Sequence, residues 1–227
     1  LAVDENVSRM LDWLKSKGRL KNTLFVYMGD NGFQFGEHGL IDKRTAYEAS
    51  IRVPLLMFCP DLIKAGTIVK RTVANIDIAP TLRDIAEALP ADAAGRFDGR
   101  SFLPLLQGNE DGWREEILYE YYWEQNYPQT PTMHGLVGDK WKYVRYHGIW
   151  DLNELYDLEG DPHEQHNLIL DPGQQERIAA MNERLFDALE ASGGGNLPLL
   201  RDRSETFPWR KKSGSSQVAF PNHWARE

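Results

Sequence analysis

The sequence has little cysteine, no long apolar run and no excess of basic residues, and each of these absences excludes a class of protein. Cys59 is the only cysteine among 227 residues, which excludes an internal disulfide and a zinc site built from several cysteines. No segment approaches the ~20 consecutive apolar residues of a membrane-spanning helix, so no membrane span is expected. The formal net charge is −8 and the basic residues are scattered, so no nucleic-acid partner is expected.

The first residues also lack the features of a natural start. There is no initiator Met, and no charged segment followed by an apolar one, as a secretory signal would have. Residues 1 to 18 already have the apolar spacing of a complete amphipathic helix, with Gly18 placed to end it. We therefore expect the chain to begin within a longer protein, and its own residues give no indication of compartment.

Two apolar segments predict strands in the first half of the chain. Residues 23 to 28 (TLFVYM) and 53 to 59 (VPLLMFC) have the pattern of strands covered on both faces in a parallel sheet. One predicted helix precedes the first strand, and another follows the second over residues 75 to 90 (NIDIAPTLRDIAEALP). This order of helices and strands predicts an α/β fold over residues 1 to 113.

From about Arg114 the pattern changes. Aromatic and β-branched runs are separated by Gly-Asp, His-Gly and Gly-Asp-Pro turns, which is typical of antiparallel strands and hairpins. Residues 172 to 191 then predict a helix with apolar residues on one face. We expect a small α+β subdomain over residues 114 to 195, followed by an extended tail over residues 196 to 227.

Polar residues follow the first predicted strand directly. Asp30 and Asn31 lie just beyond Met28, at the carboxyl end of the strand, where ligands bind in open α/β sheets. A carboxylate and an amide supply oxygen ligands that Ca²⁺ or Mg²⁺ accepts, but two residues cannot fill six or more positions. Asp-Asn-Gly is also typical of a tight turn. Taken singly, His38 and Lys43 are typical of a loop hydrogen bond and a solvated charge.

The segment NTLFVYMGDNGFQFGEHGLIDKRTAYEASIRVPLLMFCP, residues 22 to 60, resembles the sulfatase family of the alkaline-phosphatase superfamily. It has that family's order of an apolar strand, Asp-His/Asn-Gly, Gly-Glu-His-Gly, Lys, Tyr-Glu and Arg-Val-Pro-Leu. The resemblance extends to about residue 190, because GDKWKYVRYHGIWDLNELYDLEGDPHEQHNL is similar to the sulfatase C-terminal subdomain. It implies an α/β fold, part of an alkaline-phosphatase-like sandwich, with a small C-terminal antiparallel β-sheet subdomain and a helix.

The resemblance implies roles for four of these residues. Asp30 and Asn31 would be two ligands of a divalent cation, usually Ca²⁺, with Mg²⁺ as the other possibility. Lys43 would contact the sulfate, and His38 would support the site; these two are the candidate catalytic residues. A dication and an ammonium group would stabilise the negative charge that develops on the sulfate oxygens during cleavage.

The resemblance also draws attention to chemistry that these residues do not contain. Sulfatases use a formylglycine made from the Cys or Ser of a Cys/Ser-x-Pro/Ala-x-Arg element, and no segment here matches it. Cys59 is followed directly by Pro, so we interpret it as a core cysteine. We expect the chain to be the C-terminal half of a sulfatase and inactive alone. Full-length members of the family are expected to be periplasmic, secreted or lysosomal.

Residues 119 to 159 are most similar to N-acetylglucosamine-6-sulfatases, which act on sulfated glycans, so a sulfated carbohydrate is the expected partner. His134, Trp123 and Tyr122 are candidates for contacting the sugar, although aromatic residues such as Tyr122 and Trp123 are more typical of a subdomain core. Two alternatives stay open. One is a phosphodiesterase or phosphonate hydrolase of the same superfamily, and the other is a non-catalytic glycan-binding protein descended from the enzyme.

Overall fold

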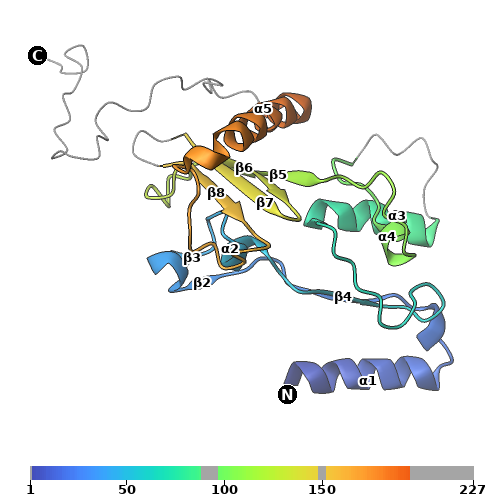
Figure 1. Cartoon of the computed structure of the whole chain (residues 1–227). Coiled ribbons are helices and arrows are strands. Elements are labelled where there is room, and N and C mark those ends of the chain that lie inside the picture. The colour runs from blue at the N-terminus through green and yellow to red at the C-terminus, as the bar shows by residue number, and fades with distance from the viewer. Residues whose placement is uncertain (1, 88–96, 148–151, 195–227) are drawn as a thin grey trace, which may run out of the picture.

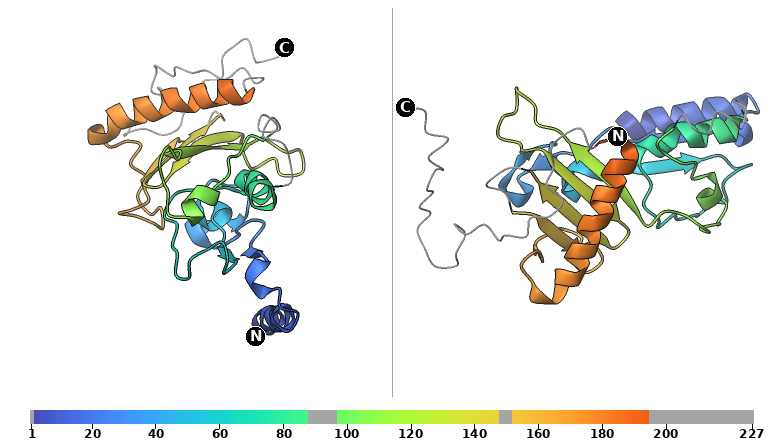
Figure 2. Two further views of the ribbon diagram at one scale, coloured as in Figure 1. Left: turned by 90° about the vertical axis from the view of Figure 1, so that its right-hand side faces the viewer. Right: turned by 90° about the horizontal axis from the view of Figure 1, so that it is seen from above.

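The computed structural model describes residues 2 to 87, 97 to 147 and 152 to 194. The predicted extended tail and the end of the predicted helix at residues 88 to 90 lie outside the described residues. The strands within these ranges form three sheets: the pair β1 and β4, the hairpin β2 and β3, and a four-stranded sheet of β5 to β8. Helices α1 and α5 lie at opposite ends of the molecule (Figures 1 and 2). No helix in the described ranges has the length and apolar character needed to cross a membrane.

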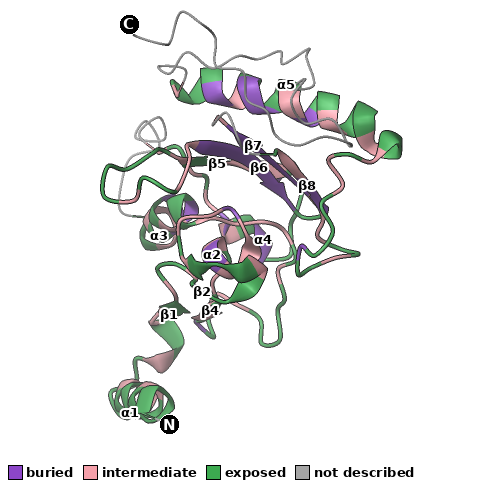
Figure 3. Cartoon of the chain, turned by 90° about the vertical axis from the view of Figure 1, so that its left-hand side faces the viewer, coloured by how far each residue is buried: buried purple, intermediate pink, exposed green. Residues whose placement is uncertain are grey.

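The N-terminal elements are the least buried part of the structure. Helix α1 (Ala2–Ser16) has the predicted amphipathic spacing, yet none of its residues is buried (Figure 3). A short 3₁₀ helix (Leu20–Asn22) leads into β1 (Phe25–Met28), which pairs with β4 (Leu55–Phe58). Both strands expose part of their apolar side chains; Leu56 is 64% exposed.

The pairing of β1 with β4 corrects one expectation. The two strands are antiparallel, and neither is covered on both faces, so the parallel arrangement read from their apolar composition is wrong for this pair. Parallel neighbours need a long crossover connection, usually a helix. The chain between β1 and β4 contains only short elements, and it therefore returns in the opposite direction. These elements are β2 (Gln34–Phe35), a 3₁₀ turn (Glu37–Gly39), β3 (Ile41–Asp42) and α2 (Glu48–Ile51).

A second packing unit follows β4. Helices α3 (Ile78–Ala86), which continues a 3₁₀ turn (Asn75–Asp77), and α4 (Leu103–Leu106) lie beside each other. Apolar side chains of α4 and Trp113 form a buried cluster here. The buried carboxylate of Asp77 accepts hydrogen bonds from the Arg114 guanidinium and from the backbone N–H of Ala74 and Arg100. Asp77 therefore joins α3 to the start of the next sheet.

The four-stranded antiparallel sheet and its helix match the prediction for the second half of the chain. The strands are β5 (Glu116–Tyr121), β6 (Met133–Gly138), β7 (Trp141–Tyr146) and β8 (Glu154–Asp157), in sequential order. Helix α5 (Gln175–Ser192), preceded by a 3₁₀ turn (Pro172–Gln174), lies across one face. We call this the helix face; Leu136, Tyr143 and Leu155 pack there against Met181, Leu185 and Leu189 of α5.

The opposite face of the sheet is covered by the chain between β1 and β4. Because successive side chains of a strand alternate between faces, this second face presents a different residue set, which includes Tyr119, Lys142, Val144, Tyr146 and Glu154. We call it the loop face. It packs on residues 29 to 52, called here the site loop, and Ala46 of that loop lies in a buried cluster with Met133, Val144 and Tyr146.

Candidate functional site

Asp30 and Asn31 begin the site loop directly after β1. The backbone N–H of Gly29 donates to Pro54 O at 3.2 Å, so pairing with the β4 side ends at the residue before Asp30. The predicted location beyond the carboxyl end of the strand is confirmed. Asp30 Oδ1 accepts the N–H of Asn31 at 2.9 Å, and Asn31 Nδ2 donates to Gly32 O at 2.7 Å. Both side chains are exposed, and the Asn31 amide oxygen is left available to another group.

That group is Lys43, which the sequence separates from Asn31 by twelve residues. Lys43 Nζ donates to Asn31 Oδ1 at 2.9 Å, and the lysine is exposed. The structure therefore brings together two of the residues that the sequence singled out. The ammonium of Lys43 and the neighbouring carboxylate of Asp30 place charges of both signs at the surface of one loop.

Helix α2 holds both arms of this loop. The backbone N–H of Gly32 donates to Ser50 O at 2.8 Å, while the buried Ser50 hydroxyl donates to Lys43 O at 2.5 Å. A Cβ at Gly32 would lie 2.1 Å from Ala49 O, so only glycine allows the chain to approach α2 this closely. Ser50 thus fixes the backbone beside Asn31 and the backbone of Lys43 relative to each other.

His38 lies on the same loop but makes different contacts. Its ring stacks on Tyr47 with centroids 3.8 Å apart and an interplanar angle of 9°, and its backbone has a φ of 55°. The Tyr47 hydroxyl donates to Glu154 Oε1 at 2.7 Å, on the loop face of the sheet. Burial raises the pKa of the Tyr47 hydroxyl. The His38 ring is therefore held in place by stacking on Tyr47, and the role of His38 in the site stays a prediction.

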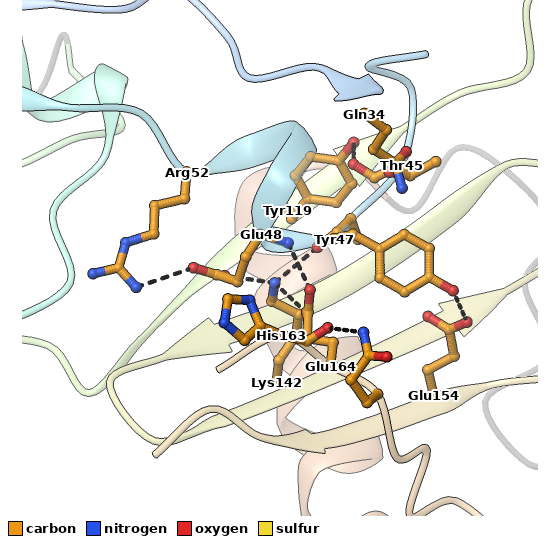
Figure 4. A network of polar contacts seen from close by, with 12 residues as sticks. Gln34, Thr45, Tyr47, Glu48, Arg52, Tyr119, Lys142, Glu154, His163 and Glu164 are labelled. Atoms are coloured by element: carbon orange, nitrogen blue, oxygen red, sulfur yellow. Dashed lines mark hydrogen bonds and ion pairs between the residues drawn. The ribbon is translucent and has the colours of Figure 1, made fainter. Parts of the chain in front are cut away.

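A buried ion cluster beneath α2 was missed in the sequence (Figure 4). Lys142 is 0% exposed, and its Nζ donates to Ala46 O at 2.9 Å, Glu48 Oε1 at 2.6 Å and Glu164 Oε1 at 2.7 Å. Glu48 also forms an ion pair with Arg52 at 3.5 Å, but Lys142 is the closer partner of Glu48. Side-chain alternation in KWKYVRY places Lys142 on the same face as Val144 and Tyr146. This pattern was the sequence signal that Lys142 could be buried.

The three predicted sugar contacts come from β6, which contains His134, and from the segment after β5, which contains Tyr122 and Trp123. His134 is 0% exposed and belongs to the helix face, since it alternates with Met133 of the loop face. Its Nδ1 lies 2.7 Å from His147 Nε2. The ring centroids of His134 and Tyr122 lie 5.3 Å apart in a T-shaped arrangement. Burial lowers the pKa of His134. Trp123 is 53% exposed. Arg44, which follows Lys43, contacts Glu124 and Tyr127, so the segment after Trp123 lies beside the site loop. The contact of the three residues with a sugar stays a prediction.

The oxygen donors of the site loop suit a hard divalent cation in kind but not in number. Asp30 and Asn31 present adjacent, exposed carboxylate and amide oxygens, the ligand types that Ca²⁺ and Mg²⁺ prefer. Within the described ranges, no three His, Cys, Asp or Glu side chains gather as they would around a metal ion. The two residues therefore fit as part of a coordination shell.

A hollow among the described residues lies away from these groups. An open depression of about 720 Å³ lies against α1 and is lined by Arg9, Met10, Trp13 and Phe25, among others. It contains none of the predicted site residues. The polar contacts of the site loop, and not this hollow, identify the candidate site.

Comparison with known proteins gives consistent likenesses. The sequence model of the family described as N-sulphoglucosamine sulphohydrolase, C-terminal, matches residues 36 to 191. The N-acetylglucosamine-6-O-sulfatase of Bacteroides thetaiotaomicron is 37% identical over 175 residues, which is 74% of this chain and 30% of the relative. The N-acetylglucosamine-6-sulfatase of Bos taurus is 33% identical over 225 residues, which covers 85% of this chain and 39% of the relative.

A solved structure shows the same likeness in three dimensions. BT4656, in complex with its substrate D-glucosamine-2-N,6-O-disulfate, superposes with a TM-score of 0.77 at 32% sequence identity. The superposition covers 86% of this chain and 40% of BT4656. The chain thus spans between 30% and 40% of the length of these three proteins.

Proposed function

The chain belongs to the N-sulphoglucosamine sulphohydrolase C-terminal family of sulfatases, and from this premise we propose that its site loop binds the sulfate group of a sulfated amino sugar during hydrolysis. The observation that carries the proposal is the hydrogen bond from Lys43 Nζ to Asn31 Oδ1, just after the end of β1. The Ser50 hydroxyl, on α2, holds the backbone of Lys43 in place. The contact between Lys43 and Asn31 supports the proposal that the lysine ammonium and the oxygen ligands of Asp30 and Asn31 act on the same anion.

Lys43 has the chemistry that sulfate cleavage requires. Negative charge develops on the sulfate oxygens and on the leaving oxygen, and a positioned ammonium lowers the free energy of that charged state. An exposed lysine stem can move its Nζ from Asn31 Oδ1 to a sulfate oxygen without rearranging the backbone that Ser50 holds. Lys43 therefore acts as a charge-stabilising donor and His38 as a nearby support.

Asp30 and Asn31 would hold a divalent cation in this proposal. Such an ion supplies Lewis-acid stabilisation of the sulfate oxygens. The part played by the chain is to present the two oxygen ligands at a fixed place: the Asp30 carboxylate accepts the Asn31 N–H, and the Asn31 amide is oriented by its bond to Gly32 O. The remaining ligands come from other groups.

The substrate class is a glycan that carries a sulfated glucosamine unit. The support for it is the substrate of BT4656 and the activity in the names of the two relatives. Trp123 and Tyr122 offer partly exposed aromatic rings, which suit stacking on a sugar. The buried His134 then acts by supporting Tyr122, whose ring lies against it.

The test is Lys43→Ala, made in the protein that contains this chain and assayed on an aryl sulfate and a 6-O-sulfated glucosamine. We expect kcat to fall about 10²- to 10³-fold on both substrates with a smaller change in KM, because the donor acts mainly in the transition state. Lys140→Ala is the matched control, since Lys140 is an exposed lysine paired with Glu159 on a turn of the sheet.

Other results would revise the proposal in defined ways. A defect confined to the sugar substrate would make Lys43 a specificity residue, and an unchanged kcat on both would exclude it from the reaction. A parent protein that hydrolyses a phosphodiester or phosphonate ester but neither sulfate ester would favour the phosphoryl-transfer alternative. Binding of the sulfated sugar without turnover would favour the non-catalytic alternative.

A further inference from the structure

The Lys142 cluster is an unusual use of a lysine. Its ammonium is removed from water and surrounded by one backbone carbonyl and two carboxylates, from Ala46, Glu48 and Glu164. Such a buried ion cluster gives little net stability, because desolvation of the charges offsets their attraction and apolar residues of similar volume often do as well. Charged hydrogen bonds do, however, fix the geometry of the groups they join. The groups joined here, Ala46 and Glu48, belong to the site loop.

Lys142 and Glu164 hold the beginning of α2 from two directions. Lys142 comes from β7, and Glu164 comes from the turn after β8, where its φ of 53° directs the side chain toward the cluster. Glu164 Oε1 accepts from Lys142 Nζ, while Glu164 Oε2 accepts the backbone N–H of Glu48 at 2.7 Å. The first residue of α2 is thus bonded through both its side chain and its backbone.

The hold on α2 continues to the residues of the proposed sulfate site. Two residues after Glu48, Ser50 accepts from Gly32 N–H with its carbonyl and donates to Lys43 O with its hydroxyl. A displacement of α2 would therefore move the backbone of Lys43 and the backbone beside Asn31. The loop face adds two further bonds near this point, from Tyr119 OH to Thr45 O and from Tyr47 OH to Glu154 (Figure 4).

We propose that Lys142 and Glu164 are positioning residues, which fix α2 and through it the distance between Lys43 and Asn31. The proposal rests on the function proposed above for Lys43 in turnover. Neither residue touches the substrate; both act through Glu48 and Ser50. The four-stranded sheet then has a second use besides folding, because it is the rigid base on which the site loop is set.

The test replaces the ion pair with neutral residues of similar size, as Lys142→Met with Glu164→Gln, in the protein that contains this chain. Removing one positive and one negative charge together leaves the net charge of the cluster unchanged, and the partly exposed Glu48 keeps its ion pair with Arg52. We expect a kcat about 10- to 100-fold lower with a smaller change in KM, since displacement of a catalytic group by about 1 Å costs up to about 10²-fold. Amide hydrogen exchange over residues 29 to 52 should become faster, while exchange over α5 should not.

The matched control is Arg114→Met with Asp77→Asn, which removes another buried ion pair, one that joins α3 to the start of β5. It should lower the melting temperature without changing kcat or exchange over residues 29 to 52. Parental exchange in the Lys142 and Glu164 variant, or an equal change in the control, would overturn the positioning role. If the parent hydrolyses no sulfate ester, the proposed function fails, and the exchange comparison still decides whether the pair positions the loop.

Discussion

The two faces of the four-stranded sheet differ in what they bury. The helix face buries Leu136, Tyr143 and Leu155 under α5, and it also buries Arg145, which bonds to Asn182 of α5. The loop face buries Lys142 and encloses Glu154 and several tyrosine hydroxyls against the site loop. Both sets come from the same strands, one residue apart. The sheet thus packs a largely apolar cluster against α5 on one face, and on the other it fixes a neighbouring loop through the charged Lys142 cluster and tyrosine hydroxyls.

The largest effect on stability is expected from breaking the loop face with Lys142→Met alone. This change leaves Glu48 and Glu164 close together without their buried cation, which typically costs about 3–5 kcal/mol. Urea denaturation measures the loss. The double change with Glu164→Gln should recover a large part of it. A single variant as stable as the parent would mean that the cluster contributes no buried charge interaction.

A comparable loss of stability, but without loss of turnover, is expected on the helix face from Leu185→Ala. Leu185 is fully buried between α5 and the sheet, and truncation of such a leucine costs about 2–5 kcal/mol. Turnover per folded molecule should stay unchanged, because the side chain has no link to the site loop. A fall in kcat at a temperature where the variant remains folded would contradict the separation of the two faces.

The faces should also respond to pH in opposite senses. Burial raises the pKa of Glu154 above 4.5, so the stability it contributes is fully present below about pH 4.5 and is lost as pH rises through the raised pKa. Burial lowers the pKa of His134 below 6.5, so its contribution is present above about pH 6.5 and is lost as pH falls through the lowered pKa.

Denaturation of Glu154→Gln and His134→Gln across pH 4 to 8 checks this contrast. Relative to the parent, Glu154→Gln should gain stability as pH rises, whereas His134→Gln should gain stability as pH falls. Slopes of the same sign for the two variants would show that burial does not control both groups.

The smallest effect is expected for Cys59→Ser, outside both faces. Cys59 is buried at the end of β4, and its Sγ donates to Lys21 O at 3.4 Å, a bond that a serine hydroxyl can replace. The free energy of unfolding should fall by at most about 1 kcal/mol, and turnover should be unchanged. Loss of the covalent step in a folded variant would make Cys59 the nucleophile and refute its interpretation as a core residue.

Much of the architecture was predictable from local patterns. The antiparallel sheet, the helix with its apolar face and the position of Asp30 after β1 follow from periodicity and turn residues, and they are confirmed. The alkaline-phosphatase-like fold class and the sulfatase family, read from ordered motifs, are confirmed as well. Such features depend on residues that lie close together in the sequence, and therefore the sequence alone predicts them.

The direction of β4 beside β1, the burial of Lys142 and the side of the sheet on which His134 lies were decided only by the tertiary structure. Apolar composition indicates that a strand pairs, but the connection decides in which direction it pairs. Lys142 and Glu48 are separated by 94 positions, and their contact depends on which face the site loop covers. A strand's alternation divides its residues into two sets, while only long-range packing determines which set becomes the core and which fixes the site.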